Sequence, residues 1–349
     1  MSLLPVIIIG FTVAFASLLV LHPFAVAIGL VDRPSARKLH SGSVPLIGGI
    51  AVFLSVAVYV FLTPNLSDKV LPLLATGSVL FLMGVIDDYR PLGVRVRVVV
   101  QVSCALLMVW MTGIKIDSLG SLFGSSNIEL GLLALPFTVL AVVGVTNAFN
   151  LIDGIDGLAG SMALIAIIGI LVFQSQSGVR AGYEYLLVLG AALIPYLILN
   201  LWGGPRFKVF MGDAGSLFIG FIIVWTLIHQ TQTAAFSISP TSALWCVAIP
   251  IIDTVGVMSR RMLKGDSPFK PDRNHLHHIL MRAGFSSFGS LVFLVSVSGL
   301  LLLFGLFIEA YLPQLSFPAF LIVFVIYVFM LRKAWKLQKL LKSSLATME

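Results

Sequence analysis

Amide and carboxylate side chains are concentrated in one short segment between two apolar stretches of the chain. The segment NAFNLIDGIDGLAG, residues 147–160, carries Asn147, Asn150, Asp153 and Asp156 at intervals of three. Residues three apart are neighbours on a helix surface, so consecutive members would lie side by side on a helix. Gly154 and Gly157 would let backbone or ligand approach closely. A polar turn with Asx capping is the alternative, but four such groups exceed what a turn requires.

An adjacent pair of carboxylates, Asp87 and Asp88, ends another apolar stretch in the segment GVIDDYR. Such a pair can be a solvated helix end, although carboxylates there oppose the negative end of the helix dipole. Without a cation the two groups repel each other, which favours a raised pKa or a bound divalent metal. Arg90, Arg95 and Arg97 follow closely and could neutralise the pair instead.

Asp213 in FMGDAGS and the histidines of NHLHH complete the set of candidate groups. Asp213 lies at the predicted start of a helix, where it could cap backbone N–H groups or where the helix start could face a phosphate. His275, His277 and His278 have no thiolate beside them and no standard zinc spacing. Contact of protonated His and Arg273 with an anionic substrate is therefore favoured over a zinc site.

Asp253 differs from the other acidic residues in its depth. In AIPIIDTVGVMSRR it lies about two helical turns from the end of an apolar stretch, where a carboxylate is expensive and tends to be paired or functional. Arg260 is one candidate partner and a sugar contact is the alternative. The sequence assigns Asp253 no role.

The elements that must position these groups are membrane helices. The chain has 349 residues, of which 58% are hydrophobic and 11% charged, too few polar groups for an ordinary soluble domain. Lipid-exposed backbone must satisfy its own hydrogen bonds, so apolar runs of about 20 residues are predicted to be helices. We therefore expect one all-α domain over residues 1–349, a polytopic integral membrane helical bundle of about 11 transmembrane helices. The runs are 4–22, 44–63, 70–86, 98–114, 130–149, 158–175, 183–202, 215–230, 241–258, 288–308 and 315–331.

The basic residues predict the orientation of the bundle, because Lys and Arg are retained on the cytoplasmic side. Nineteen of the 22 fall on one side of the predicted topology, and only Lys69, Lys115 and Arg180 fall on the other. This distribution predicts an N-terminus outside and a C-terminus in the cytoplasm. It also predicts that all the candidate groups lie in cytoplasmic loops, at residues 87–97, 147–157, 206–216 and 260–282.

The chemistry that such groups support is phosphate chemistry at a membrane face. Hard oxygen ligands suit Mg²⁺ or Mn²⁺, and Mg²⁺ uses few protein ligands because substrate phosphates and water complete its shell. Basic residues beside the metal indicate an anionic, phosphorylated cytoplasmic substrate, and the membrane setting indicates a lipid as the second substrate. A transporter is a different reading, but most of the carboxylates lie at one face. A lipid-binding scaffold would not require five aspartates.

Four motifs carry a family resemblance. The segments GVIDDYR, NAFNLIDGIDGLAG, KVFMGDAGS and SPFKPDRNHLHHILMRAGF resemble, in this order, the signatures of the polyprenyl-phosphate N-acetylhexosamine-1-phosphate transferases. The likeness extends from GLVDRPSARKLHSGSVPLIGG through the histidine motif. Within the family the pattern is most similar to the bacterial enzymes that use UDP-GlcNAc and undecaprenyl phosphate. Leu276 interrupts the histidines, which departs from the relatives that transfer phospho-MurNAc-pentapeptide.

The resemblance implies roles for individual residues. Asp213 resembles the metal-ligating aspartate, with Asn150 as the second ligand. Asp156 and Phe210 resemble uridine contacts, and Arg97 stands where relatives often have lysine, which binds phosphate differently. The residues expected to be catalytic are Asp87, Asp88, Asp153, Asp156 and His277. Those expected to bind substrate are Asn147, Phe210, Arg97, Lys208, Arg273, His275 and His278.

The resemblance also implies the reaction, the partners and the location. GlcNAc-1-phosphate would pass from UDP-GlcNAc to undecaprenyl phosphate with release of UMP, with Mg²⁺ or Mn²⁺ as cofactor, as the first membrane step of O-antigen or enterobacterial common antigen synthesis. A related transferase for another UDP-N-acetylhexosamine or for phospho-MurNAc-pentapeptide is the alternative. The expected location is the bacterial inner membrane; no nucleic acid is expected as partner, and a homo-oligomer is left open. Direct attack by the lipid phosphate and a covalent intermediate on Asp87, Asp88 or Asp156 are both open.

Overall fold

A computed structural model describes most of the chain: residues 3–32, 42–63, 70–124, 126–176, 183–233, 238–263, 265 and 275–346, with the side chains of residues 332 and 334–346 excepted. Helices dominate, and one antiparallel ladder joins β1 (Val31–Asp32) to β2 (Val44–Pro45). The α-helices are α1 (Leu3–Ile28), α2 (Gly48–Leu62), α3 (Val70–Tyr89), α4 (Val94–Thr112), α5 (Ala134–Ile152), α6 (Leu158–Gln176), α7 (Glu184–Trp202), α8 (Gly204–Phe207), α9 (Gly212–Gln232), α10 (Pro240–Cys246), α11 (Ala248–Leu263), α12 (Leu276–Arg282), α13 (Ser287–Tyr311) and α14 (Ser316–Ala346).

The predicted class, a polytopic helical membrane protein, is confirmed. In the described part of the chain, nine helices are long and apolar enough to cross a membrane, and the bent pair of α10 and α11 would make ten. α2 is apolar as well but has only 15 residues. The predicted number of about 11 is reached only if α2 and the bent pair are both counted as spans. The orientation of the termini stays a prediction.

The predicted run 241–258 is not one helix. α10 ends at Cys246, Val247 adopts a non-helical conformation, and α11 leaves at an angle of 88°. Pro250 explains the break, because proline donates no N–H and its ring clashes with the carbonyl four residues earlier, here that of Cys246. The proline is tolerated in the first turn of α11, where backbone N–H groups have no partner in the helix.

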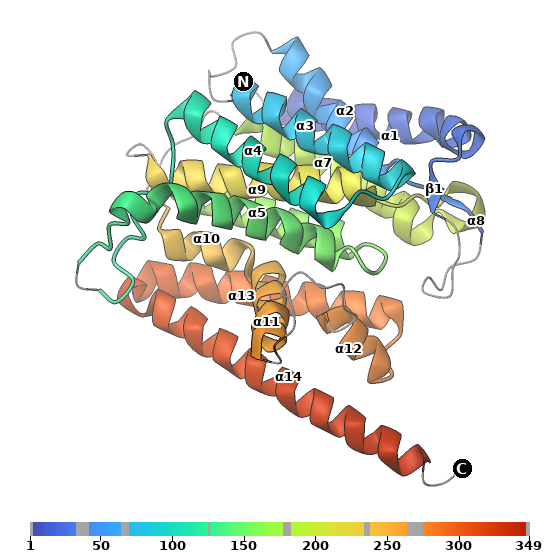
Figure 1. Cartoon of the computed structure of the whole chain (residues 1–349). Helices are drawn as coiled ribbons and strands as arrows, with labels where there is room; N and C mark the ends of the chain where they lie inside the picture. Colours follow the sequence, from blue (N-terminus) through green and yellow to red (C-terminus); the bar gives the residue numbers. More distant parts are fainter. Residues whose placement is uncertain are drawn as a thin grey trace.

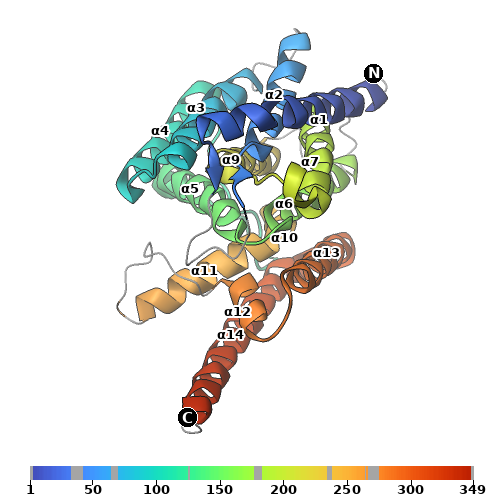
Figure 2. The ribbon, with the colours of Figure 1, turned by 90° about the vertical axis from the view of Figure 1, so that its right-hand side faces the viewer.

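α9 is the central helix of the bundle. Figure 2 shows it surrounded by α1 to α7. Of the residues in its most apolar 18-residue stretch, 94% are buried. Small residues bring its first turns close to two neighbouring helices: a Cβ added at Gly49 of α2 would lie 2.2 Å from Cα of Gly215, and one added at Gly84 of α3 would lie 2.4 Å from Cα of Ala214. Close backbone approach through small residues is how membrane helices gain packing contacts.

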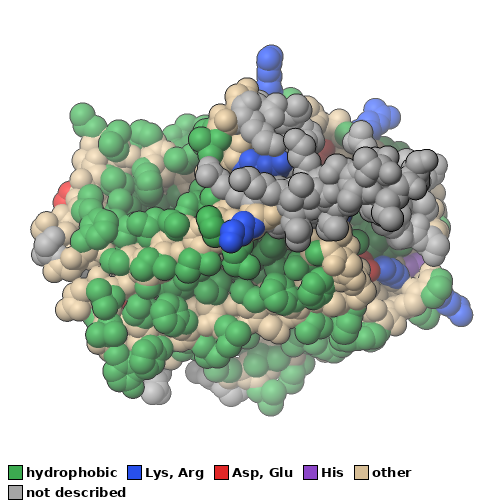
Figure 3. Space-filling model, turned by 90° about the horizontal axis from the view of Figure 1, so that it is seen from below, with side chains coloured by type: hydrophobic (Ala, Val, Ile, Leu, Met, Phe, Trp, Pro, Cys, Tyr) green, Lys and Arg blue, Asp and Glu red, His purple; other side chains and the backbone are tan. Residues whose placement is uncertain are grey.

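The elements that carry the candidate groups gather at one end of the bundle. β1, α8, α12 and the turn between α5 and α6 all lie at the right-hand end in Figure 1. Figure 3 shows a face on which hydrophobic side chains cover most of the left, while Lys, Arg and His lie toward the centre and right. This polar end therefore corresponds to the side on which the sequence places the candidate loops.

The contact between α2 and α9 gives a test of the packing. Gly49→Ala should destabilise the protein by about 1–3 kcal/mol, because the new methyl group meets the backbone of Gly215 and the helices must move apart. Gly144→Ala is the matched control, since a Cβ on that residue of α5 meets nothing within 4 Å. Thermal unfolding of the two variants in detergent measures the difference. Equal unfolding temperatures for both would contradict the packing described.

Candidate active site

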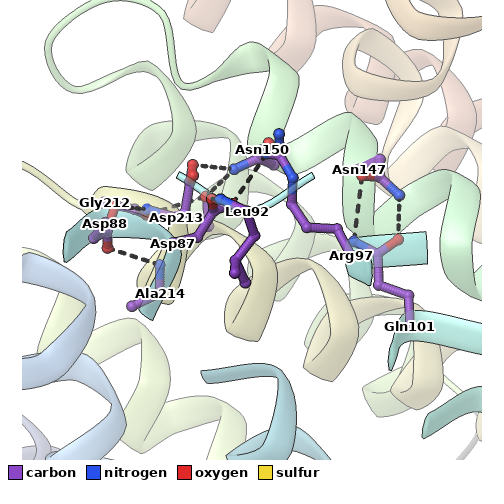
Figure 4. A network of polar contacts seen from close by, with 11 residues as sticks. Asp87, Asp88, Leu92, Arg97, Gln101, Asn147, Asn150, Gly212, Asp213 and Ala214 are labelled. Carbon is purple, nitrogen blue, oxygen red and sulfur yellow. Dashed lines mark hydrogen bonds and ion pairs between the residues drawn. The ribbon is translucent and has the colours of Figure 1, made fainter. Parts of the chain in front are cut away.

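Asp88 holds the start of α9 from the end of α3. Its two carboxylate oxygens accept hydrogen bonds from the backbone N–H groups of Asp213 (2.8 Å) and Ala214 (3.1 Å), as Figure 4 shows. The N-cap residue of α9, Met211, makes no side-chain capping bond. Asp88 therefore supplies the cap from another helix and satisfies donors that would otherwise be unpaired.

Asp213 does not cap its own helix, so that alternative is wrong. Its Oδ1 accepts a hydrogen bond from Nδ2 of Asn150 at 2.7 Å, and the same amide group lies 3.0 Å from the Ser216 hydroxyl. Asn150 uses its Nδ2 group for both contacts, so its amide oxygen is the atom that it could offer to a cation. The two residues expected to bind metal are thus in direct contact.

Asp87 is not a solvated helix end, because only 6% of its surface is exposed. Its Oδ1 accepts from the backbone N–H of Leu92 at 2.6 Å, and its Oδ2 lies 3.1 Å from a guanidinium nitrogen of Arg97. The suggestion that a nearby arginine neutralises the pair holds for Asp87 and Arg97. Each member of the aspartate pair therefore has a different partner: Asp87 pairs with a cation and Asp88 with a helix end.

Residues 147–156, with their polar groups at intervals of three, are helical only in their first half. α5 ends at Ile152, so Asn147 and Asn150 lie on the helix, whereas Asp153 and Asp156 lie in the turn that follows. Asn147 exchanges hydrogen bonds with Gln101 of α4 at 2.6 and 3.3 Å and lies apart from the aspartates in Figure 4. Its polar groups are therefore already paired within the bundle.

The turn after α5 brings two more carboxylates to the site. Asp156 forms an ion pair with the ammonium group of Lys208 at 2.7 Å. Burial, with smaller contributions from the Asp213 and Asp156 carboxylates, raises the pKa of Asp153 to about 7. Among the described residues no ion pair reaches Asp88, Asp153 or Asp213. The site has an excess of negative charge that a cation would relieve.

Asn200 is a positioning residue that the sequence analysis missed. From α7 it accepts a hydrogen bond from the backbone N–H of Gly157 at 2.6 Å and donates one to the carbonyl of Val209 at 2.8 Å. It thereby ties the turn after α5 to the segment before α9. A single amide within the apolar run LILNLW was the signal, because a buried amide needs partners.

Phe210 is held by backbone hydrogen bonds. Its N–H donates to the carbonyl of Pro45 in β2 at 2.9 Å, and its carbonyl accepts from Gly48 at 2.8 Å. The ammonium group of Lys208 lies 5.4 Å from the centre of its ring. The predicted uridine contacts Phe210 and Asp156 therefore share one neighbour, Lys208.

The histidine motif lies against the turn after α5. His277 is buried, and a Cβ added at Gly154 would come within 2.1 Å of its Nε2 atom. Burial lowers the pKa of His277 to about 3, and the adjacent His278 and nearby His275 lower it as well. Burial therefore favours the neutral form of His277 at pH 7. Arg273 lies outside the described residues.

The folded chain thus gathers most of the predicted residues around two contacts. One group lies where α3, α5 and α9 meet (Figure 4) and consists of Asp87, Asp88, Asn150 and Asp213. The other lies at the turn after α5, where Asp156 pairs with Lys208 and Gly154 lies against His277. In the described part of the chain, no three His, Cys, Asp or Glu side chains form a metal site by themselves. Oxygen ligands from few residues suit Mg²⁺ that is also held by substrate phosphates.

Three known proteins similar to this chain carry the same activity in their names. A match to glycosyl transferase family 4 covers residues 70–231. Undecaprenyl-phosphate alpha-N-acetylglucosaminyl 1-phosphate transferases are 39% identical in Yersinia pestis over 336 residues (95% of this chain, 92% of the relative) and 39% identical in Haemophilus influenzae over 341 residues (95% of each). The chain belongs to this family of transferases. The Escherichia coli K12 transferase is 38% identical over 327 residues, 90% of this chain and 87% of the relative.

Membership of the family confirms the resemblance of the four motifs. The match to glycosyl transferase family 4 runs from α3 to the end of α9 and so contains the contact between Asp88, Asn150 and Asp213. The histidines of α12 lie beyond that match but within a chain that the curated transferases resemble over nearly its full length. The candidate site therefore includes residues inside the matched region and histidines beyond it.

The capping role of Asp88 can be tested by substitution. In Asp88→Asn one carboxylate oxygen becomes an NH₂ group that opposes a backbone N–H at the start of α9. The free energy of unfolding should therefore fall by about 2 kcal/mol. The transfer rate should fall on the order of 100-fold, because Asp213 moves with the helix start. Asp117→Asn is the control, since the side chain of Asp117 is exposed and forms a surface ion pair with Lys115. A variant with normal transfer and normal thermal stability would refute this role.

The contact between His277 and Gly154 gives a second test. Gly154→Ala places a methyl group where Nε2 of His277 lies, so the histidine motif must shift. We expect a loss of transfer on the order of 100-fold with little change in unfolding temperature, since Gly154 itself is exposed. Gly144→Ala should keep the wild-type rate. Full activity of Gly154→Ala would mean that His277 need not keep this position.

Proposed function

We propose that the protein transfers GlcNAc-1-phosphate from UDP-GlcNAc to undecaprenyl phosphate and releases UMP. The observation that carries the proposal is the meeting of Asp87, Asp88, Asn150 and Asp213, from helices far apart in sequence, in a chain similar over nearly its full length to transferases of this name. Their oxygen atoms and the basic groups beside them suit a diphosphate substrate.

A divalent cation, Mg²⁺ or Mn²⁺, is part of the proposal. Asp213 and the amide oxygen of Asn150 would hold it, and the surplus of carboxylates around Asp153 supports a cation there. A bound cation would neutralise charge on the diphosphate. This charge develops as the bond breaks between the bridging oxygen and the phosphorus that bears GlcNAc. Because Mg²⁺ binds through one or two carboxylates plus substrate phosphates, a sparse protein ligand set is consistent with this role.

Direct displacement is the mechanism that the contacts favour. The second pKa of a phosphate monoester is about 6, so the lipid phosphate is mostly dianionic at pH 7 and needs no general base. Its oxygen would attack the phosphorus that bears GlcNAc, and the bond to the UMP oxygen would break. The aspartates considered as nucleophiles are already engaged: Asp87 with Arg97, Asp88 with the start of α9, and Asp156 with Lys208. Arg97 and Lys208 would offset charge on the substrate phosphates.

The setting of the reaction is also a proposal. The multi-pass helical structure supports a location in a membrane, and we assign the chain to the bacterial inner membrane with its site facing the cytoplasm. The basic loops support this orientation. The pathway served would be O-antigen or enterobacterial common antigen synthesis, for which this transfer would be the first membrane step.

A transfer assay tests the function. Purified protein is incubated with undecaprenyl phosphate, Mg²⁺ and a panel of radiolabelled UDP-sugars, while UMP release and label entering the lipid are followed. We expect transfer from UDP-GlcNAc that depends on the lipid, stops when EDTA removes the metal and returns with added Mg²⁺ or Mn²⁺. Asp213→Asn should raise the Mg²⁺ concentration needed for half-maximal rate, because one charged oxygen is lost.

The outcomes separate the parts of the proposal. Transfer from another UDP-sugar would replace the donor and keep the chemistry. Transfer that persists in EDTA would remove the metal from the mechanism. If no UDP-sugar supported transfer, the transporter hypothesis would be favoured instead, and uptake into vesicles would test it.

A further inference from the structure

Asp253 is a buried carboxylate that the proposed mechanism does not use. It is 2% exposed, and three groups, two at the start of α12 and one in α14, lie within hydrogen-bond distance of it. His275 lies 2.8 Å from Oδ2 through its Nδ1 atom, while the backbone N–H of Leu276 (3.0 Å) and the hydroxyl of Tyr327 (2.6 Å) donate to Oδ1. Arg260, one of the two alternatives for Asp253, is not one of these three groups. Both oxygens of Asp253 are therefore directed at the start of α12 and at α14.

This arrangement fixes the orientation of the His275 ring. A carboxylate accepts hydrogen bonds and donates none, so the Nδ1 atom that faces it must carry the proton. The Nε2 atom then lies on the far side of the ring, buried and without a partner among the described residues. A carboxylate that holds one ring nitrogen of a histidine and leaves the other for ligand or substrate is a recurring way of orienting that ring.

The ring of His275 lies beside that of His277, the next histidine of the motif. The rings of His275 and His277 are parallel within 7°, with centroids 6.1 Å apart. His277 in turn lies against Gly154, in the turn that carries Asp153 and Asp156. A continuous set of contacts therefore runs from Tyr327 of α14 through Asp253 and the two histidines to the acidic turn.

The geometry points to Asp253 as a positioning residue for the transfer reaction: with Tyr327 and the Leu276 N–H it fixes the Nδ1–H form of His275 and the placement of His277 over the acidic turn. This inference rests on the proposed function, because the reaction to be affected is that transfer. Asp253 does not touch the substrate in this role. It acts through the histidines.

Two substitutions test the inference. Asp253→Asn keeps the shape of the side chain and its acceptor for Tyr327, but it presents an NH₂ group to Nδ1 of His275, which forces the proton to Nε2. Tyr327→Phe removes one of the three hydrogen bonds to Asp253. Tyr185→Phe is the matched control, because it removes a buried hydroxyl that lies 2.8 Å from Thr226 and has no contact with the histidines.

Two readouts are needed, one of which does not depend on activity. Nitrogen-15 NMR of protein labelled at histidine reports which ring nitrogen of His275 carries the proton, with His275→Gln used to assign its signals. We expect Asp253→Asn to convert His275 to the Nε2–H form and to lower kcat on the order of 100-fold. Tyr327→Phe should lower kcat several-fold, and Tyr185→Phe should leave both readouts unchanged. All variants should unfold within a few degrees of the wild type.

The results distinguish this role from a structural one and from a failure of the proposed function. If Asp253→Asn kept the Nδ1–H form or the wild-type kcat, the positioning role would be overturned. If it lost activity only in proportion to a large fall in unfolding temperature, Asp253 would be a structural residue of the bundle. If the wild type itself transferred no sugar phosphate, the proposed function would fail, while the NMR comparison would still decide whether Asp253 orients His275.

Discussion

The hydrogen bonds from the first turn of α9 to Asp88 are the constraint on which the site depends. α9 is surrounded by other helices, so water cannot easily satisfy the N–H groups at its start, and an unpaired N–H in such surroundings is costly. Asp88 can reach them only because Gly84 lets α3 approach the backbone of Ala214. With that contact in place, Asp213 faces Asn150 of α5. The packing of α3, α5 and α9 therefore also brings the acidic residues together.

The acidic centre illustrates how a membrane protein can keep several carboxylates close together. Asp87 and Asp156 each have a basic partner, Asp88 is neutralised in part by a helix start, and Asp153 retains a proton up to about pH 7 because burial raises its pKa. Each group is stabilised by a different means. Among the described residues Asp153 and Asp213 have no basic partner, so a bound cation would change the charge of this centre most.

Much of this could be predicted from the sequence, and the failures have physical causes. Long apolar runs predicted the helices because lipid leaves the backbone no alternative, and charge asymmetry predicted that the polar loops share one end. The break at Val247 was missed because the effect of Pro250 on the preceding turn was not weighed against hydropathy. The partners of Asp88 and Asp253 could not be predicted, since backbone N–H groups and a tyrosine far along the chain carry no sequence signal. Asn200 did carry one, as a lone amide in an apolar helix.

The contact of Tyr327 with Asp253 has a consequence for how the protein is made. Tyr327 lies in α14, which leaves the ribosome after the helices that carry the carboxylates and amides around α9. A nascent chain that has inserted everything up to α13 already holds the acidic centre but lacks the hydroxyl that completes the partners of Asp253. Completion of these contacts therefore waits for the synthesis of α14, and a chain truncated before α14 would carry the acidic centre without the Tyr327 hydroxyl.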